Sequence, residues 1–231
     1  MLNRRQLLQH LGAGFALSCV PYSSIAATHG DGIKYGMVID VRRCTNCQSC
    51  LVSCSIENGV PQGRSRGSLK RMSVQQDSHL TSLTVPVQCA QCDRPACVEA
   101  CPADATGKLN NGIVYIDYDA CIGCQSCVEA CPYQARVADP NFEVPPEKCN
   151  FCLHRLEAGL LPACVESCIG SARVFGDLND PDSKINALLK NNKIYTLLKQ
   201  ENTQPNIFFI GLPDTLDEQA IITMNEMEWQ R

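Results

Sequence analysis

Short apolar runs recur along the chain, and most of them lead into a loop that contains cysteine. Runs of about four to eight residues that are rich in Val, Ile and aromatic side chains are typical of β-strands. They predict strands over residues 35–41, 69–74, 80–87, 113–117, 172–175 and 206–210, with the second and third as a hairpin. Strand, cysteine loop and short helix follow one another repeatedly, which indicates an internal repeat.

The pattern changes after Gly176, where the cysteines end. Apolar residues at helical spacing then predict an amphipathic helix over 182–199. We expect the tail over 214–231 to become ordered only against a partner, so residues 177–231 are interpreted as a partner-docking extension. No apolar run after residue 30 is long enough to cross a bilayer, and we therefore expect membrane attachment to come from another subunit.

Residues 1–26 have the pattern of an export signal rather than of a folded domain. Arg4 and Arg5 precede an apolar run over 11–20, which is followed by small residues that suit cleavage. This pattern predicts a twin-arginine signal peptide and a periplasmic protein. The alternatives are an ordinary amphipathic N-terminal helix and lipidation of Cys19.

Cysteine is the chain's most distinctive residue: 17 occur in 231 residues, and sixteen of them form four quartets. The quartets are Cys44, Cys47, Cys50 and Cys54; Cys89, Cys92, Cys97 and Cys101; Cys121, Cys124, Cys127 and Cys131; and Cys149, Cys152, Cys164 and Cys168. The first and third have the spacing C-x2-C-x2-C-x3-C, which wraps a [4Fe–4S] cluster in bacterial ferredoxins. The fourth cysteine of such a run ligates the other cluster of a pair, so each run implies a partner run.

Other uses of cysteine fit this spacing less well. A structural zinc site needs only four ligands, usually as two C-x2-C pairs. A disulfide framework favours small chains with dispersed cysteines, and a thioredoxin-like pair accounts for only two of them. Covalent haem needs C-x-x-C-H, which the segment from Cys149 to His154 misses by one residue. Iron–sulfur ligation is therefore the prediction, and we expect the chain to fold poorly without iron.

The charge balance argues against nucleic acid as a partner. The formal net charge is −4, and the predicted signal contains two arginines but no acidic residue, so the remainder is more acidic still. Thiolate-ligated clusters add further negative charge. Among basic residues next to the cysteines, Arg43 and Lys148 are candidates for tuning cluster potentials. The alternative is that they are solvated or contact a neighbouring side chain.

The fourth quartet and its surroundings carry a family resemblance. Residues 149–168 (CNFCLHRLEAGLLPACVESC), together with segments 39–44, 57–58 and 61–63, are similar to the four-cluster electron-transfer subunits of molybdopterin oxidoreductases. Within that family they resemble the iron–sulfur subunits of tetrathionate reductases. The similarity spans about residues 30–212.

The resemblance implies an α+β fold with two ferredoxin-like halves over residues 27–176, each half holding two [4Fe–4S] clusters. The first and fourth quartets form one half, and the second and third form the other. The implied ligands are set A (Cys44, Cys47, Cys50, Cys168), set B (Cys54, Cys149, Cys152, Cys164), set C (Cys89, Cys92, Cys97, Cys131) and set D (Cys101, Cys121, Cys124, Cys127).

The resemblance also implies the role of the chain. Electrons from an integral-membrane quinol-oxidising subunit pass through the half made by the second and third quartets, then through the other half. They reach a molybdopterin catalytic subunit that reduces tetrathionate to thiosulfate, while this chain is itself non-catalytic. The alternatives are the same role in a thiosulfate, polysulfide, dimethyl sulfoxide or formate enzyme, and a free-standing ferredoxin. Twin-arginine export of a folded protein would deliver the clusters already inserted.

Three charged residues lie in the long insert of the fourth quartet: His154, Arg155 and Glu157. They either face the molybdenum subunit or form an internal ion-paired hairpin.

Overall fold

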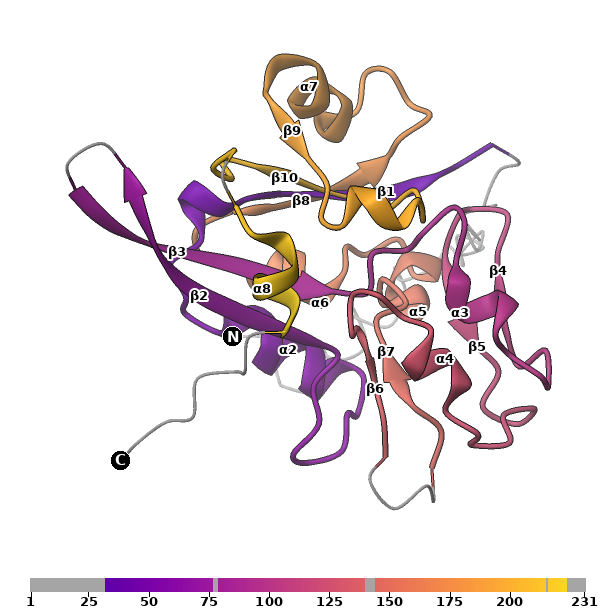
Figure 1. Ribbon diagram of the computed structural model, residues 1–231. Helices are drawn as coiled ribbons and strands as arrows, with labels where there is room; N and C mark the ends of the chain where they lie inside the picture. Colours follow the sequence, from indigo (N-terminus) through magenta and orange to yellow (C-terminus); the bar gives the residue numbers. More distant parts are fainter. Residues whose placement is uncertain (1–31, 77–78, 140–143, 215, 224–231) are drawn as a thin grey trace, which may run out of the picture.

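The computed structural model describes residues 32–76, 79–139, 144–214 and 216–223 (Figure 1). The predicted signal peptide over 1–26, including Cys19, lies outside these residues. Strands, short helices and cysteine loops alternate along the described chain. The fold is therefore mixed α and β.

The main sheet has four strands in the order β8-β1-β10-β9. β1 (Tyr35–Asp40) pairs antiparallel with β8 (Arg173–Asp177) and parallel with β10 (Ile207–Ile210), which pairs antiparallel with β9 (Ile194–Tyr195). The predicted strands at 35–41, 172–175 and 206–210 are thus confirmed. The sheet joins the start of the described chain to segments that follow the last quartet.

The two faces of this sheet have different neighbours. α7 (Lys184–Asn191) packs against one face, and the cysteine-bearing helices lie on the other side (Figure 1). The alternation of side chains along β1 explains the division. Val38 packs with Ile185 and Ile210 on the α7 side, whereas Met37 and Ile39 belong to the larger core on the cysteine side.

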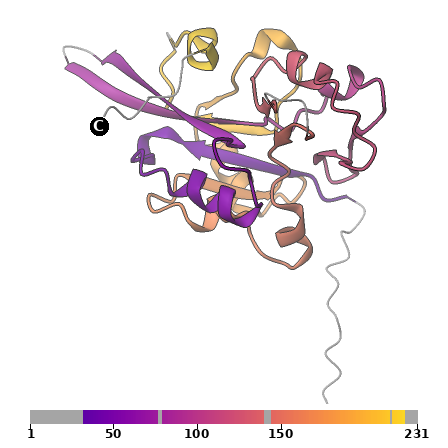
Figure 2. The same cartoon turned by 90° about the horizontal axis from the view of Figure 1, so that it is seen from below.

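The predicted hairpin is present and is longer than its apolar runs. β2 (Gly67–Gln76) and β3 (His79–Gln88) form one antiparallel ladder. Figures 1 and 2 show that it projects from one end of the molecule. The small ribbon of β4 (Thr106–Lys108) and β5 (Val114–Ile116) lies at the opposite end, and β5 confirms the predicted strand at 113–117.

Short elements carry the quartets. They are η1 (Val41–Arg43), α2 (Ser49–Glu57), α3 (Ala96–Glu99), α4 (Ser126–Glu129), β6 (Arg136–Val137), β7 (Glu147–Lys148), α5 (Leu153–Glu157) and α6 (Ala163–Glu166). β6 pairs antiparallel with β7. α2 packs against α6, and α3 packs against α4. The first quartet is thereby joined to the fourth, and the second to the third.

The predicted helix over 182–199 is wrong in its second half. α7 ends at Asn191, and the side chains of Asn191 and Asn192 donate to the carbonyls of Ala187 and Leu188 at 2.8 and 3.0 Å. These side-chain bonds satisfy carbonyls that another helical turn would have used. The chain then enters the main sheet as β9 and makes a 3₁₀ turn, η2 (Lys199–Glu201).

Part of the C-terminal tail is ordered within the chain itself. α8 (Glu218–Thr223) places Ile221 and Ile222 in the main core, with exposed fractions of 0% and 2%. The expectation that the whole tail needs a partner is therefore wrong for these residues. The end of the tail, from residue 224, lies outside the described residues.

Across the described segments, no helix combines the length and the apolar character that a bilayer span requires.

Candidate iron–sulfur site

The four quartets occupy loops that share one backbone feature. The residue before the second cysteine has a positive φ in every quartet: Asn46 at 56°, Gln91 at 50°, Gly123 at 72° and Phe151 at 54°. Three of these residues are not glycine, so the loop must hold them in a conformation that is costly for side chains. Each loop therefore turns sharply between its first two thiols, as a chain does when it wraps a compact group.

A short helix in each loop positions the third and fourth thiols. Cys50, Cys97, Cys127 and Cys164 are each the second residue of a helix, in α2, α3, α4 and α6 respectively. The fourth cysteine of each quartet follows four residues later. Cys54 lies within α2, whereas the fourth cysteine of each other quartet lies two residues beyond the end of its helix, where it can reach a second site.

Thiols from different quartets lie close enough to affect one another's ionisation. Burial is the main cause that raises the pKa of these thiols, and neighbouring thiols raise it further: Cys50 and Cys168 act on Cys44; Cys164 and Cys152 on Cys54; Cys89, Cys97 and Cys131 on Cys92; and Cys101 and Cys121 on Cys127. Each of these four groups lies within one set, A, B, C or D, although Cys50 of set A also acts on Cys164 of set B. All sixteen described cysteines are free of disulfides.

Set A also lines a cavity of its own. Cys44, Cys47, Cys50 and Cys168 surround it, and Arg173 forms part of the same wall. Four thiols from two distant quartets thus face one space beside a buried cation. This arrangement suits a group that accepts one thiolate at each of its corners.

Burial stabilises the protonated form of several of these thiols. It raises the pKa of Cys54 and of Cys92 to about 12, and that of Cys131 to about 11. Because the thiolate is the metal ligand, iron must displace these protons when it binds. Metal binding and the ordering of this interior are therefore coupled.

Two of the described thiols are exposed to solvent, and their pKa values are lowered rather than raised: Cys47 of set A and Cys124 of set D. The backbone N–H of Ser49 is the main donor that lowers the pKa of Cys47. The hydroxyl of Ser126, 3.5 Å from the Cys124 sulfur, has the same role for the pKa of Cys124. Sets A and D thus each present one thiol at the surface.

Two buried arginines contact the thiols, and the sequence reasoning missed both. Arg173 donates to the sulfurs of Cys50 and Cys164 at 3.8 and 4.0 Å. Arg136 donates to the sulfur of Cys97 at 3.1 Å, and its positive charge offsets part of the rise that burial causes in the pKa of Cys127. The one sequence signal is an equal offset, because each arginine follows the last cysteine of its quartet by five residues.

Sets B and C adjoin each other at Cys149 and Cys89. Burial and Cys164 are the two largest causes that raise the pKa of Cys149 in set B. The next largest cause is Cys89 of set C. Lys148 is 2% exposed there, and its Nζ donates to the backbone carbonyls of Val114 and Cys149. This candidate tuner is therefore buried between two sets. The other candidate, Arg43, is exposed and donates to the carbonyl of Gly170 at 2.9 Å.

Asn58 supplies a further donor to the thiols. Its Nδ2 lies 3.7 Å from the sulfur of Cys54 and 3.5 Å from that of Cys152, both in set B. Arg66 donates to its Oδ1 at 2.8 Å and forms an ion pair of 2.6 Å with Glu147. The amide is thus oriented by a buried pair whose members lie far apart in sequence.

Side chains in the insert of the fourth quartet contact Glu57 in α2, the helix that carries part of the first quartet. His154 lies 2.9 Å from Glu57, and Arg155 pairs with the other oxygen of Glu57 at 2.7 Å. Arg155 also pairs with Glu166. His154 and Arg155 thus form ion pairs with Glu57 and Glu166 rather than within the insert itself, and Glu157 is exposed. Contact of these residues with the molybdenum subunit stays a prediction.

Unpaired polar atoms test whether an iron–sulfur cluster fits this interior. Among the described residues, Nε and Nη1 of Arg136 are buried without a hydrogen-bond partner. Such donors are costly to leave unpaired, and the sulfides of a cluster are acceptors. No three His, Cys, Asp or Glu side chains in the described chain converge on one ion. The residues present fit cubane clusters, whose thiol ligands bind separate irons.

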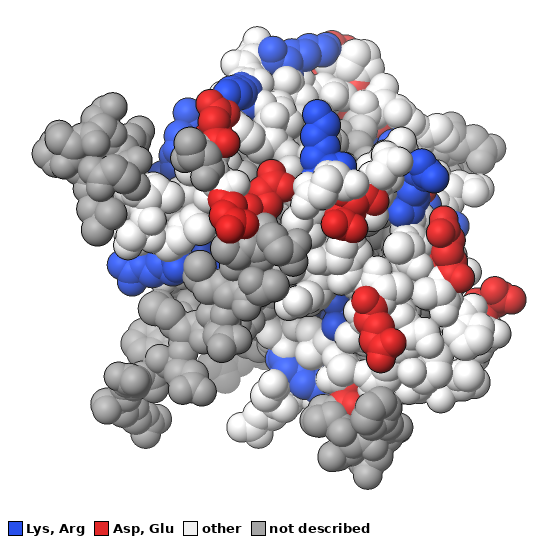
Figure 3. Space-filling view, viewed as in Figure 1, with Lys and Arg blue, Asp and Glu red and all other residues white. Residues whose placement is uncertain are grey.

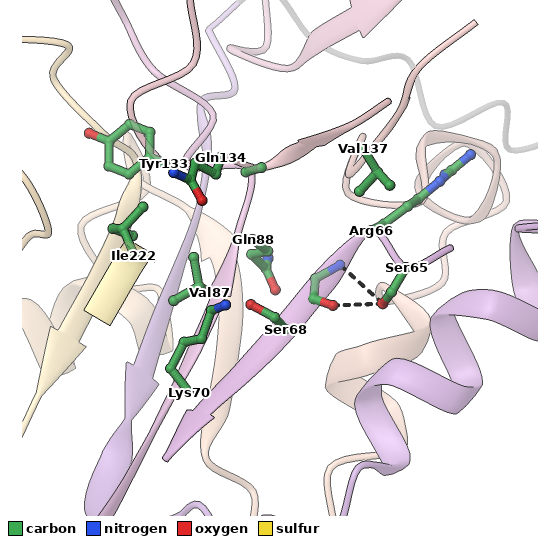
Figure 4. Close-up of a pocket in the computed structure, with 12 residues that line it drawn as sticks. Ser65, Arg66, Ser68, Lys70, Val87, Gln88, Tyr133, Gln134, Val137 and Ile222 are labelled. Atoms are coloured by element: carbon green, nitrogen blue, oxygen red, sulfur yellow. Dashed lines mark hydrogen bonds between the residues drawn. The ribbon is translucent and has the colours of Figure 1, made fainter. Parts of the chain in front are cut away.

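The pocket in Figure 4 lies beside this interior, where β2 and β3 meet residues 133–137 and Ile222. Its described lining contains no cysteine. Gln88 connects it to the thiols, because its amide oxygen accepts from Arg173 at 2.5 Å. On the face shown in Figure 3, acidic and basic side chains are interspersed.

Comparisons with known proteins agree with this site. Residues 80–178 match the family of 4Fe-4S dicluster domains. The B subunit of tetrathionate reductase from Salmonella typhimurium is 45% identical over 224 residues, covering 92% of this chain and 89% of that protein. The B chain of polysulfide reductase from Wolinella succinogenes is 39% identical, with 77% and 94% covered. The B subunit of tetrathionate reductase from Archaeoglobus fulgidus is 38% identical, with 79% and 84% covered.

A dicluster-type arrangement of cysteines on a mixed α and β fold defines an iron–sulfur electron-transfer protein. This protein belongs to the iron–sulfur subunits of molybdopterin oxidoreductases. It carries iron–sulfur clusters, transfers electrons and is non-catalytic within a multi-subunit reductase complex. The predicted family and role are thereby confirmed.

Proposed function

We propose that the chain holds four [4Fe–4S] clusters on sets A, B, C and D, in two ferredoxin-like halves. The grouping of the thiols carries this proposal, because each mutually interacting group combines cysteines from two quartets. The shared loop conformation supports four equivalent sites rather than two. The packing of α2 on α6 and of α3 on α4 supports one cluster pair in each half.

The clusters form a line in the order D, C, B, A. Contacts between neighbouring sets support this order: Arg136 reaches C and D, Cys89 and Cys149 adjoin between C and B, and Arg173 reaches B and A. The exposed thiols belong to the two terminal sets. As the family resemblance implies for the half made by the second and third quartets, electrons arrive at set D from a membrane quinol-oxidising subunit and leave from set A to a molybdopterin catalytic subunit.

The terminal acceptor of the complex is tetrathionate, which the catalytic subunit reduces to thiosulfate. The support is the likeness to two tetrathionate reductase subunits, one of them at 45% identity over nearly the whole chain. The B chain of polysulfide reductase and the B subunit of selenate reductase are also similar, at 39% and 36% identity. Polysulfide and selenate are therefore the alternative electron acceptors that an assay must distinguish from tetrathionate.

The protein acts on the periplasmic side of the membrane. Residues 1–26 are a twin-arginine signal peptide, 27–176 hold the clusters, and 177–231 serve partner docking in addition to their place in the sheet. The arginine pair Arg4–Arg5 supports the export route, since that pathway carries folded proteins with cofactors inserted. A partner subunit provides the membrane attachment.

Purification of the whole complex under anaerobic conditions tests this function. We expect about sixteen iron and sixteen sulfide per copy of this chain, after correction for the clusters of the partner subunits. Quinol-driven reduction should proceed with tetrathionate and not with polysulfide or selenate. Eight iron per chain would reject the four-cluster proposal, and preference for another acceptor would reject the substrate alone.

A further inference from the structure

The two buried arginines occupy equivalent places in the chain. Arg136 and Arg173 each follow the fourth cysteine of a quartet by five residues and each begin a strand, β6 or β8. A residue with positive φ precedes each by two positions: Gln134 at 49° and Ser171 at 48°. The same backbone turn therefore directs both side chains into the interior.

Arg173 lies between sets A and B. Its guanidinium donates to Cys50 of set A at 3.8 Å and to Cys164 of set B at 4.0 Å. The residue is 6% exposed, and Gln88 fixes its orientation by accepting a hydrogen bond of 2.5 Å. One fixed positive charge thus adjoins both thiol sets of this half.

Arg136 has the corresponding position between sets C and D. It donates to Cys97 of set C at 3.1 Å and is 3% exposed. It begins β6, which packs against α4, the helix that carries Cys127 of set D, and its charge offsets part of the rise that burial causes in the pKa of that thiol. Thr106 accepts from it at 2.7 Å and orients it. Its Nε and Nη1 are buried and have no hydrogen-bond partner among the described protein atoms. Acceptors for these two donors must therefore come from a bound group.

A fixed positive charge beside a cubane favours the reduced form, which carries one more negative charge than the oxidised form. An arginine keeps its charge at every pH at which the protein is folded. In an interior of low polarity, the effect of such a charge is larger than at the surface. A cation shared by two neighbouring clusters therefore favours reduction of both.

We propose that Arg136 and Arg173 are paired positioning residues, and that each raises the reduction potentials of the two clusters in its own half. This inference rests on the proposed four-cluster assignment. It adds that the potentials are set pairwise, by one shared cation in each half. Both clusters of a half then stay reducible, and the shared cation imposes no difference between their reduction potentials.

The test uses the whole complex with Arg173→Met, Arg136→Met, and Arg43→Met as the matched control. Arg43 carries the same charge next to Cys44, but its guanidinium is exposed and bonds a backbone carbonyl. Electron paramagnetic resonance during a redox titration gives each cluster's potential, and iron and sulfide analysis gives the number of clusters. We expect Arg173→Met to lower the potentials of two clusters and Arg136→Met those of the other two. The oxidised-to-reduced ratio at fixed potential should rise about tenfold for each affected cluster.

The outcomes separate this inference from the function on which it rests. Four clusters with unshifted potentials, or equal shifts in Arg43→Met, would overturn the inference and leave the four-cluster proposal standing. Two clusters in the unmodified chain would remove both. Arg173→Lys and Arg136→Lys should retain most of the potential, since they keep the charge. If the Met variants lose iron, Arg→Gln variants replace them, and loss of iron there too would assign the arginines to assembly and reject tuning.

Discussion

At the scale of single residues, the environment of each thiol depends on side chains that are not ligands. Asn58, Arg136 and Arg173 all donate to sulfur, and each is oriented by a further polar partner. Hydrogen bonds to sulfur and local charge are the means by which a protein adjusts the potential of a cluster. The chain therefore contributes to electron transfer through these donors as well as through its cysteines.

Asn58 offers a test in set B alone. Asn58→Leu removes both N–H donors to sulfur without changing the net charge. These bonds stabilise the more negative, reduced form, so one cluster should show about a tenfold higher oxidised-to-reduced ratio at fixed potential. Redox titration of the complex measures it. The control is Asn191→Leu, which removes an amide donor to a helix carbonyl; equal potentials in both variants would contradict the assignment.

The sequence reveals the cysteine quartets more readily than it reveals the side chains around them. Cysteine spacing is local, so the quartets could be recognised from the order of residues alone. The contact between Arg173 and Cys50 joins residues 123 positions apart, and the only local sign of it is the offset of Arg173 from Cys168. Asn58 entered the sequence reasoning only as a mark of resemblance. The assignment of the sixteen cysteines to sets A to D stays a prediction.

At the scale of elements, a helix pair and a four-stranded sheet position the thiols of sets A and B. Apolar runs predicted the main strands and the hairpin because strand periodicity is strong in those segments. The predicted helix over 182–199 is too long because Ile194, Leu197 and Leu198 also fit helical spacing. Their actual role is tertiary: Ile194 pairs with Ile210 in the sheet, and Leu197 and Leu198 are buried in the main core.

The contact between α7 and the sheet is tested by Ile185→Ala. Ile185 is 0% exposed and packs with Val38 and Ile210 on the face away from the thiols. The cavity left behind should destabilise the folded protein by about 2–5 kcal/mol without changing any cluster potential. Thermal unfolding of the complex, with Lys184→Ala as the exposed control on the same helix, measures the difference. A shift no larger than that of the control would mean that α7 contributes little to the fold.

At the scale of the whole molecule, the proposed line of clusters runs from one exposed thiol to another. Cys124 lies at one terminal set and Cys47 at the other, with buried cations between successive sets. This arrangement accounts for a protein that conducts electrons between two partners and needs no catalytic group of its own. Fourteen of the sixteen described cysteines are buried or partly buried, which shields a bound cluster from water and from loss of iron.

Export of the whole folded molecule is tested at Arg4 and Arg5. Changing both to Lys keeps the charge but removes the twin-arginine pair. We expect the protein to remain in the cytoplasm with its clusters intact, as measured by fractionation and by the visible absorbance of the clusters. A protein changed at Arg42 and Arg43 serves as the control with the same substitutions elsewhere. Continued arrival in the periplasm would contradict the predicted signal.

The interleaved pairing of quartets is the central claim, and Cys101 tests it most directly. Cys101→Ser replaces a soft thiolate by a harder oxygen ligand at one corner of one cluster. Electron paramagnetic resonance on this variant should match Cys124→Ser, because both residues belong to set D, and should differ from Cys92→Ser in set C. A spectrum of Cys101→Ser that instead matches Cys92→Ser would mean that each quartet binds its own cluster, and the interleaved arrangement would be wrong.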